Sequence, residues 1–135
     1  MANNPHVLLA TRHAQLDRIT TDLSTSAIFN IYAGVQPADT SAATTAANTI
    51  VAALAFPSTN AFAAAAASAM AANTITSDSS AAGGTAAWFS LTKSTGLRVL
   101  DGSVGTSGAD LNLNSLTITT GSTVSITAFT VTAAA

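Results

Sequence analysis

Few residues in this chain could perform acid–base, nucleophilic or metal chemistry. Among its 135 residues there are two histidines and six aspartates, and there is neither glutamate nor cysteine. His6 and His13 lie seven residues apart and would share one face of a helix, but no third metal ligand accompanies them. His13 and Asp17 lie four residues apart, which favours a weak helix-surface pair over an oriented general base. We therefore assign neither a metal site nor a catalytic dyad to the histidines.

One aspartate-containing segment is similar to a calcium-binding loop but lacks two required residues. Asp110–Asn114 alternates polar residues with leucine, like the start of an EF-hand loop. Ser115 stands where that loop needs glycine, and Gly121 stands where it needs a bidentate glutamate. The strict alternation instead predicts a strand with one polar face.

The glycines and serines carry no catalytic motif either. A phosphate-binding loop needs a following lysine and a helix, and neither accompanies the glycines at positions 83, 84, 102, 105 and 108. We interpret these glycines as turn residues. Serine is abundant, but no segment resembles the nucleophile elbow of a serine hydrolase. We therefore predict that the protein is not an enzyme, and we assign no catalytic, cofactor-binding or metal-binding residue and no cofactor.

The composition favours a structural role. Hydrophobic residues make up 48% of the chain, but alanine alone supplies 31 residues, and only 7% of all residues are charged. Burying an alanine methyl stabilises a fold much less than burying leucine or phenylalanine. We therefore expect a thin core that is stabilised further by homo-oligomer contacts or by docking on a larger assembly.

Neither nucleic acid nor a membrane is an expected partner. The net charge is −2, and the four basic residues are scattered, so no phosphate-binding surface is predicted. These basic residues are Arg12, Arg18, Lys93 and Arg98. The apolar run from 50 to 72 is interrupted by Pro57–Asn60, and alanine is only weakly apolar, so we predict no membrane span.

Residues 5–24 are predicted to form a helix. Asn4 is a favourable N-cap, and Pro5 suits the first helical position. The larger apolar residues recur at helical spacing, at Leu9, Leu16, Ile19 and Leu23. Four of the charged residues also lie here. Two interpretations are open: a helix that covers one face or edge of a sheet, or an arm that docks on another subunit.

From residue 27 onward the apolar pattern alternates, which predicts short strands separated by turns. The clearest strands are expected at 27–34, 50–56, 87–93, 97–101, 111–118 and 124–132. Asp101-Gly102 and the glycines after it are expected to break the chain. The last strand changes phase between Ile126 and Phe129, which indicates a bulge or burial on both faces. Residues 61–72 are alanine-rich enough for a helix, but they lack a clear cap, and we favour an extended segment.

The expected fold class is mainly β. We predict an antiparallel β-sandwich or jelly-roll-like domain of seven or eight short strands with an N-terminal α-helix. The length suits a single domain over residues 1–135, in which 1–26 form the helix or arm and 27–135 form the sandwich.

Three segments of the C-terminal half form a distinctive pattern: Gly84–Leu91, Leu100–Leu113 and Thr123–Val131. The most specific stretch is Asp101–Leu113, with the sequence DGSVGTSGADLNL. Together with the segments around Ile31–Pro37 and Asn73–Asp78, the pattern covers most of residues 28–132 and resembles a family of small virion proteins of tailed bacteriophages. The alanine run at 63–67 departs from that family.

The resemblance implies a β-rich virion structural protein, assembled in the cytoplasm of a bacterial host, with no enzymatic residues to carry over. The position expected first is the capsid surface, as a head decoration or cement protein. Its partners would be the major capsid protein or other virion proteins, and it would form a homo-oligomer, a trimer or a dimer. The alternatives are a tail, neck or fibre-associated protein, or a carbohydrate-binding adsorption module that uses Tyr32 and Trp88.

Overall fold

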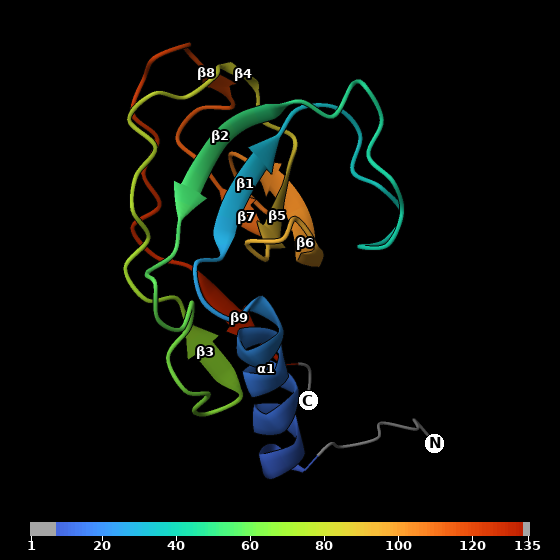
Figure 1. Ribbon diagram of the computed structural model, residues 1–135, viewed down its shortest axis with the longest axis vertical. Helices are drawn as coiled ribbons and strands as arrows, with labels where there is room; N and C mark the ends of the chain where they lie inside the picture. Colours follow the sequence, from blue (N-terminus) through green and yellow to red (C-terminus); the bar gives the residue numbers. More distant parts are fainter. Residues whose placement is uncertain (1–7, 134–135) are drawn as a thin grey trace.

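The fold is mainly β with one N-terminal helix, as the sequence predicts. The computed structural model describes residues 8–133 (Figure 1). Its helix is α1 (Leu9–Leu23). The described chain then contains nine strands: β1 (Ile28–Tyr32), β2 (Ile50–Ala55), β3 (Ala69–Ala71), β4 (Gly84–Thr85), β5 (Trp88–Thr92), β6 (Arg98–Gly105), β7 (Leu111–Asn112), β8 (Thr117–Ile118) and β9 (Thr130–Thr132).

Five of these strands form one sheet, in the order β2-β1-β5-β6-β7. Neighbours in this sheet are antiparallel except at one edge, where β7 runs parallel to β6. The other strands form two small antiparallel pairs, β3 with β9 and β4 with β8. The mainly β class is therefore confirmed, but the expectation of purely antiparallel pairing is wrong at β6–β7. The described strands form one five-stranded sheet and two short pairs rather than a regular jelly roll.

The helix α1 packs one face against the core. Leu16 and Leu23 are 3% and 0% exposed, and Ile19 is partly buried against the same cluster. Leu9, at the other end of the predicted apolar stripe, is 45% exposed. The first interpretation of this segment therefore describes the structure, because the helix contributes large side chains to the core.

The C-terminal end of α1 agrees with the prediction, and its N-terminal end differs from it. The helix begins at Leu9, and Leu8 precedes it with a non-helical backbone and no side-chain cap. The predicted start at Asn4 and Pro5 lies outside the described residues. At the other end, Ser24 has a φ of 59° and its N–H donates to the carbonyl of Thr20, so the helix ends where the sequence predicts.

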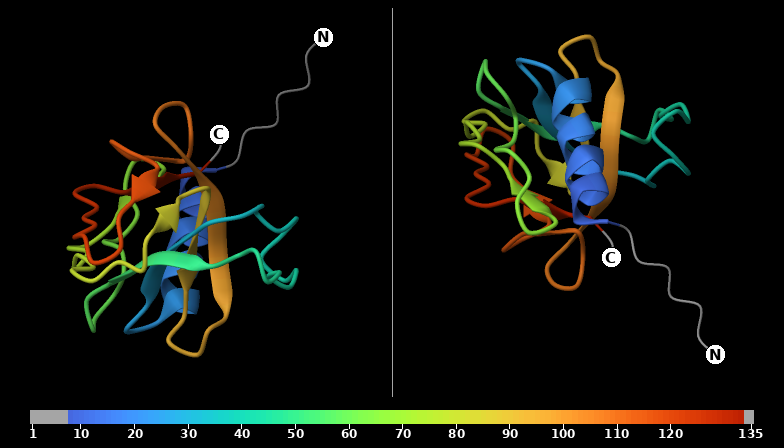
Figure 2. Two further views of the ribbon diagram at one scale, coloured as in Figure 1. Left: turned by 90° about the horizontal axis from the view of Figure 1, so that it is seen from above. Right: turned by 90° about the horizontal axis from the view of Figure 1, so that it is seen from below.

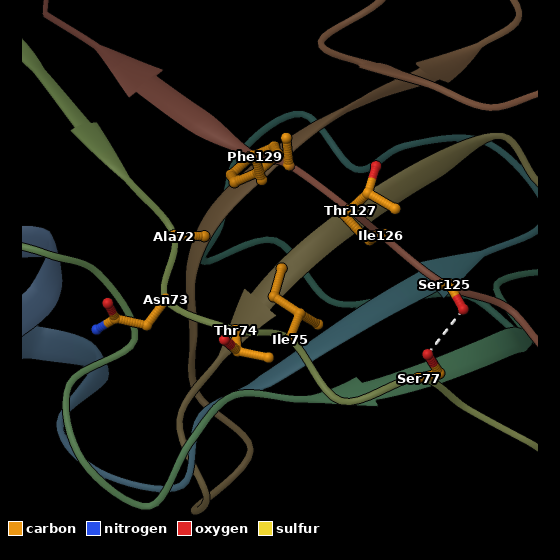
Figure 3. Close-up of a pocket in the computed structure, with 10 residues that line it drawn as sticks. Ala72, Asn73, Thr74, Ile75, Ser77, Ser125, Ile126, Thr127 and Phe129 are labelled. Atoms are coloured by element: carbon orange, nitrogen blue, oxygen red, sulfur yellow. Dashed lines mark hydrogen bonds between the residues drawn. The ribbon is translucent and has the colours of Figure 1, made fainter.

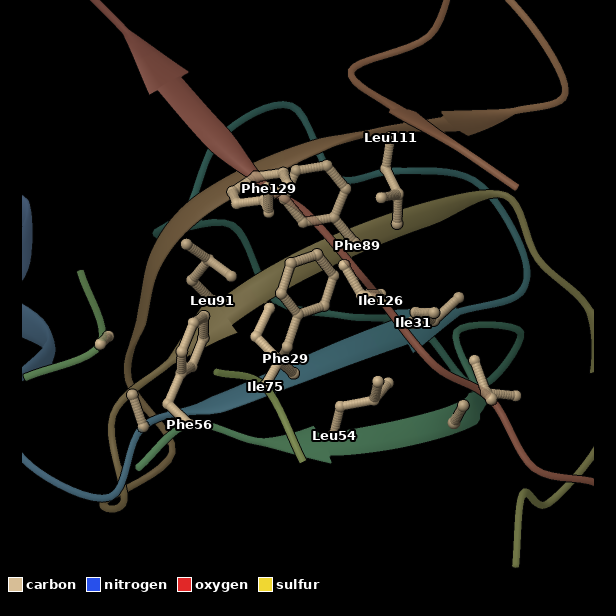
Figure 4. Packing of buried hydrophobic residues seen from close by; sticks show 14 of the residues in the cluster. Phe29, Ile31, Leu54, Phe56, Ile75, Phe89, Leu91, Leu111, Ile126 and Phe129 are labelled. Atoms are coloured by element: carbon tan, nitrogen blue, oxygen red, sulfur yellow. The ribbon is translucent and has the colours of Figure 1, made fainter. Parts of the chain in front are cut away.

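The centre of the core is a cluster of phenylalanine rings (Figure 4). Phe29 and Phe89 stack with their centroids 5.0 Å apart, and Phe129 meets both edge-on at 5.2 and 5.3 Å. Phe56 and Phe62 adjoin this trio, and all five rings are buried. These are all the phenylalanines of the chain. The core is therefore less thin than the composition suggests, because each buried ring removes roughly 150–250 Å² from water.

The strand β6 is longer than predicted, because Gly102 continues it instead of breaking it. A Cβ at Gly102 would lie 2.5 Å from Cε1 of the Phe89 ring, so only glycine leaves room for that ring against the strand. Gly105 ends the strand beside Ala109, whose Cβ would lie 3.0 Å from a Cβ at position 105. Gly108, with a φ of 67°, does lie in a turn. The sequence interpretation of turn glycines is thus wrong for Gly102, where close packing decides, and for Gly84 and Gly105, which lie in β4 and β6.

The final predicted strand is interrupted. Val124 forms an isolated bridge with Asp78, residues 125–129 belong to no strand, and pairing resumes only in β9. Val124, Ile126 and Phe129 are all buried in the core cluster. The predicted change of phase is therefore real, and its effect is to return Phe129 to the same core that receives Ile126.

The alanine-rich segment from 61 to 72 is extended, as favoured from the sequence. Phe62 and Ala72 form an isolated bridge, and a tight turn joins Ala66 to Ala69. Ala67 and Ser68 in this turn have φ values of 50° and 64°, which a helix would not allow.

Candidate functional site

His13 and Asp17, which the sequence predicts to form a weak pair on the helix surface, both hold the alanine-rich segment against α1. The Nε2 atom of His13 accepts a hydrogen bond from the backbone N–H of Ser68 at 3.1 Å. An Asp17 carboxylate oxygen accepts one from the backbone N–H of Ala65 at 3.0 Å. The predicted His13–Asp17 pair is therefore replaced by two parallel contacts to the same loop, and both side chains serve the fold. His6 lies outside the described residues.

Asp39 and Asp78 lie in loops, and each accepts hydrogen bonds from backbone N–H groups. Asp39 accepts hydrogen bonds from the hydroxyl and N–H of Ser41 and from the N–H of Ala42, and these bonds hold the pKa of Asp39 below its ordinary value. Asp78 accepts from the N–H of Ala53 and of Ser80, which lowers its pKa in the same way. Such carboxylates stay ionised, and a low pKa makes them poor general bases at neutral pH.

The Asp101–Leu113 stretch folds into one connected unit, which comprises the end of β6, the loop between β6 and β7, and β7 itself. Asp110 accepts hydrogen bonds from both the N–H and the hydroxyl of Ser103, each at 2.8 Å, and these bonds lower the pKa of Asp110. Asn112 closes the same loop by bonding both the N–H and the carbonyl of Ala109. Leu111 is buried in the core. The segment that is similar to a calcium loop is thus held by its own polar side chains.

One cluster in the described chain combines charged and aromatic side chains, and sequence reasoning singled out its Tyr32 and Trp88 but missed its charged pair. Arg98 and Asp101, both on β6, form a salt bridge of 2.6 Å, with side chains only 9% and 5% exposed. The guanidinium of Arg98 lies 5.5 Å from the ring centroid of Trp88. Trp88 in turn stacks on Tyr32 with centroids 4.2 Å apart and planes 9° from parallel. Burial raises the pKa of the Tyr32 hydroxyl, which therefore stays protonated.

Arg98 also anchors the loop between β1 and β2. Its Nη2 atom donates to the backbone carbonyls of Asp39 and Ala42. The indole Nε1 of Trp88 and the Oδ1 of Asp101 are buried without a hydrogen-bond partner in the described chain. The only sequence signal for the charged pair was a basic residue three positions before an aspartate in a predicted strand, and such spacing is too common to be diagnostic.

Three further polar residues lie on the same face of the sheet as Tyr32 and Trp88. Asn30, Ser90 and Thr92 alternate with core residues on β1 and β5, yet they are 7%, 0% and 5% exposed. The Asn30 amide donates to the Thr92 hydroxyl, which also bonds the Ser90 hydroxyl, each at 3.3 Å. These hydrogen bonds therefore tie β1 to β5 on that face of the sheet.

A groove of about 450 Å³ lies between residues 72–77 and residues 125–129 (Figure 3). Ile75, Ile126 and Phe129 contribute apolar side chains to it, and the hydroxyls of Ser77 and Ser125 meet across it at 2.7 Å. No titratable side chain lines this groove. The groups that line it are backbone amides, hydroxyls and apolar side chains.

Neither the described residues nor the comparisons with known proteins identify a more specific site. Within residues 8–133, no group of three or more histidine, cysteine, aspartate or glutamate residues is placed to hold a metal ion. No helix in that range is long and apolar enough to cross a membrane. Comparison of the chain with protein-family models, with curated proteins and with solved structures gave no match.

Proposed function

We propose that this protein is a structural component of a bacteriophage virion, and specifically a head decoration or cement protein. In this role it binds the major capsid protein as a homo-oligomer and stabilises the head. Multivalent docking of a small domain around symmetry axes provides avidity without requiring a large core in each copy.

One observation carries the proposal. The segment with the most specific resemblance to virion proteins, Asp101–Leu113, is a fold-defining unit: Gly102 admits the Phe89 ring, and Asp110 braces the β6–β7 loop. Relatives of a structural protein are expected to share the residues that maintain its fold, and the residues of this motif have that role. A motif that surrounded an open cluster of acid–base groups would have favoured an enzyme.

The use of the aspartates supports the same conclusion. In the described chain every aspartate is engaged by a backbone amide, a hydroxyl or an arginine. Four of these contacts join segments far apart in sequence or close a loop. The carboxylates that make these four contacts therefore stabilise the chain's own loops.

The adsorption-module alternative is less well supported by the geometry. A sugar-binding platform needs an exposed aromatic face, but Tyr32 is 9% exposed, Trp88 is 0% exposed, and each covers a face of the other. A tail, neck or fibre position is the second candidate, because the same fold and the same resemblance suit it equally.

The number of copies per particle separates the two positions. Intact particles should be purified and the protein quantified by mass spectrometry against the major capsid protein. A copy number that is a simple multiple of the capsomers supports the cement role, and particles that lack the protein should then lose heat resistance. A copy number near six or twelve refutes the capsid position and favours the neck or tail, and absence from the particle refutes the virion role itself.

A further inference from the structure

The strand β2 is an edge strand whose own sequence does nothing to block pairing with another chain. It is the outermost strand on its side of the five-stranded sheet (Figures 1 and 2). Edge strands usually avoid such pairing through charged residues, proline or a covering segment, but the sequence of β2, IVAALA, contains neither a charge nor proline. A six-residue uncharged strand without proline has the features of segments that pair edge to edge. Its protection must therefore come from elsewhere in the chain.

Alternate residues of β2 direct their backbone groups away from β1. The N–H of Phe56, directly after β2, donates to the carbonyl of Ala27, directly before β1. Because backbone groups alternate along a strand, those of Ala55, Ala53 and Val51 face the open side of the sheet. These are the donors and acceptors that a strand of another chain would need.

Residues 76–83, the covering segment, run along this open side of β2 (Figure 1). At one end, Thr76 and Ala55 exchange both backbone hydrogen bonds, at 2.8 and 3.3 Å. At the other end, the N–H of Gly83 donates to the carbonyl of Val51 at 3.2 Å. The covering segment therefore occupies both ends of the β2 edge with backbone groups of its own.

The middle of the β2 edge is held by a side chain instead. The backbone N–H and carbonyl of Asp78 both pair with Val124, at 3.0 and 2.8 Å, so they are not free to serve β2. The Oδ2 atom of Asp78 accepts the N–H of Ala53 at 3.0 Å, and its Oδ1 atom accepts the N–H of Ser80 at 2.9 Å. The carboxylate therefore replaces a strand carbonyl, and it also places a negative charge at an edge that has none of its own.

We propose that the Asp78 carboxylate seals the edge of β2 against β2 of a second copy. Its bond to Ala53 is the central contact of the covering segment, and without it only the contacts of Thr76 and Gly83 hold that segment to β2. A segment with fewer hydrogen bonds opens locally more often. Two exposed β2 strands then pair antiparallel, because identical strands related by a twofold axis present the same groups to each other.

Four variants of the purified chain test this seal independently of the proposed function. Asp78→Ala removes both acceptor oxygens. Asp39→Ala is the matched control, because Asp39 also accepts from two backbone N–H groups in a loop, but its bonds stay within the loop between β1 and β2. Ala53→Lys, added to Asp78→Ala, places a new charge on an exposed position of the bare edge. If Asp78→Ala does not fold by circular dichroism, Asp78→Ser replaces it, since one hydroxyl can still accept from Ser80 but leaves no second oxygen for Ala53.

Amide hydrogen exchange, resolved by NMR at low protein concentration, measures the seal itself. We expect the Ala53 amide to be protected in the parent chain and in Asp39→Ala, and to exchange about tenfold faster or more in Asp78→Ala. An Ala53 amide that exchanges at the same rate in the parent and in Asp78→Ala would overturn the proposal. So would an Ala53 amide that exchanges in the parent as fast as in an unfolded chain, a result that requires no variant to fold.

Sedimentation velocity over a range of concentrations measures what the seal prevents, with the parent chain as the baseline at each concentration. We expect Asp78→Ala to add larger species whose share rises with concentration. Asp39→Ala, and Asp78→Ala combined with Ala53→Lys, should sediment like the parent. The proposal is overturned if Asp78→Ala sediments like the parent throughout, if Asp39→Ala associates to the same extent, or if Ala53→Lys leaves the association of Asp78→Ala unchanged.

Discussion

Replacing Gly102 by alanine tests how tightly the Asp101–Leu113 unit is built. The new Cβ would lie 2.5 Å from Cε1 and 2.6 Å from Cζ of Phe89, far inside van der Waals contact. Phe89 cannot move away freely, because it stacks on Phe29 and meets Phe129 edge-on. The backbone of Gly102 lacks a positive φ, so the expected penalty is steric alone.

Overpacking of this kind destabilises a core by about 1–3 kcal/mol. For a domain of this length, each kcal/mol lowers Tm by about 3–5 °C. We therefore expect Gly102→Ala to lower Tm by about 6–10 °C at a penalty of roughly 2 kcal/mol, measured by thermal and urea unfolding followed by circular dichroism.

A second substitution shows whether the clash is the cause. Leucine lacks the Cε1 and Cζ atoms, so Phe89→Leu removes the clash at its own expense of about 1–2 kcal/mol. The double variant should then be more stable than the sum of the two single effects by about 1 kcal/mol or more. A Gly102→Ala chain within about 0.5 kcal/mol of the parent, or strictly additive effects, would refute this account of Gly102.

Two further predictions concern the charged groups. Arg98→Ala leaves Asp101 buried and unpaired, so urea unfolding should show a loss of about 3 kcal/mol, whereas Arg18→Ala, which removes an exposed pair, should change stability by less than about 0.5 kcal/mol; equal effects would contradict the assigned burial. The hydrogen bonds to Asp110 hold its pKa in the folded chain below that in the unfolded chain. Their stabilisation is therefore complete above the unfolded-chain pKa and is lost as the pH falls through the folded-chain pKa. Asp110→Asn should flatten the acid side of the plot of unfolding free energy against pH, and an unchanged slope there would show that Asp110 does not contribute.

The candidate groups differ in how far sequence reasoning could reach them. Strands β1, β2 and β5 were predictable because their apolar residues alternate, and a period of two depends only on neighbours in the chain. The contacts of His13 with Ser68 and of Arg98 with Ala42 were not predictable, because they join residues more than fifty positions apart. No local spacing encodes such contacts.

The same distinction explains the errors in strand length. Glycine in a predicted strand usually indicates a turn, since its backbone is permissive. Gly102 is required instead because the Phe89 ring, thirteen residues earlier, crosses the strand at that point. In the last segment, the phase change between Ile126 and Phe129 was visible, but whether it meant a bulge or burial on both faces depended on what lay beside it.

By itself, the sequence determined the mainly β class, the N-terminal helix and the scarcity of groups for catalysis. These properties follow from composition and from local periodicity. Only the tertiary structure decided that Arg98 and Asp101 are buried under a loop, that β7 runs parallel to β6, and that residues 125–128 remain unpaired beside an open groove. Each of these depends on which distant segments meet, because burial and backbone pairing belong to pairs of segments and not to either segment alone.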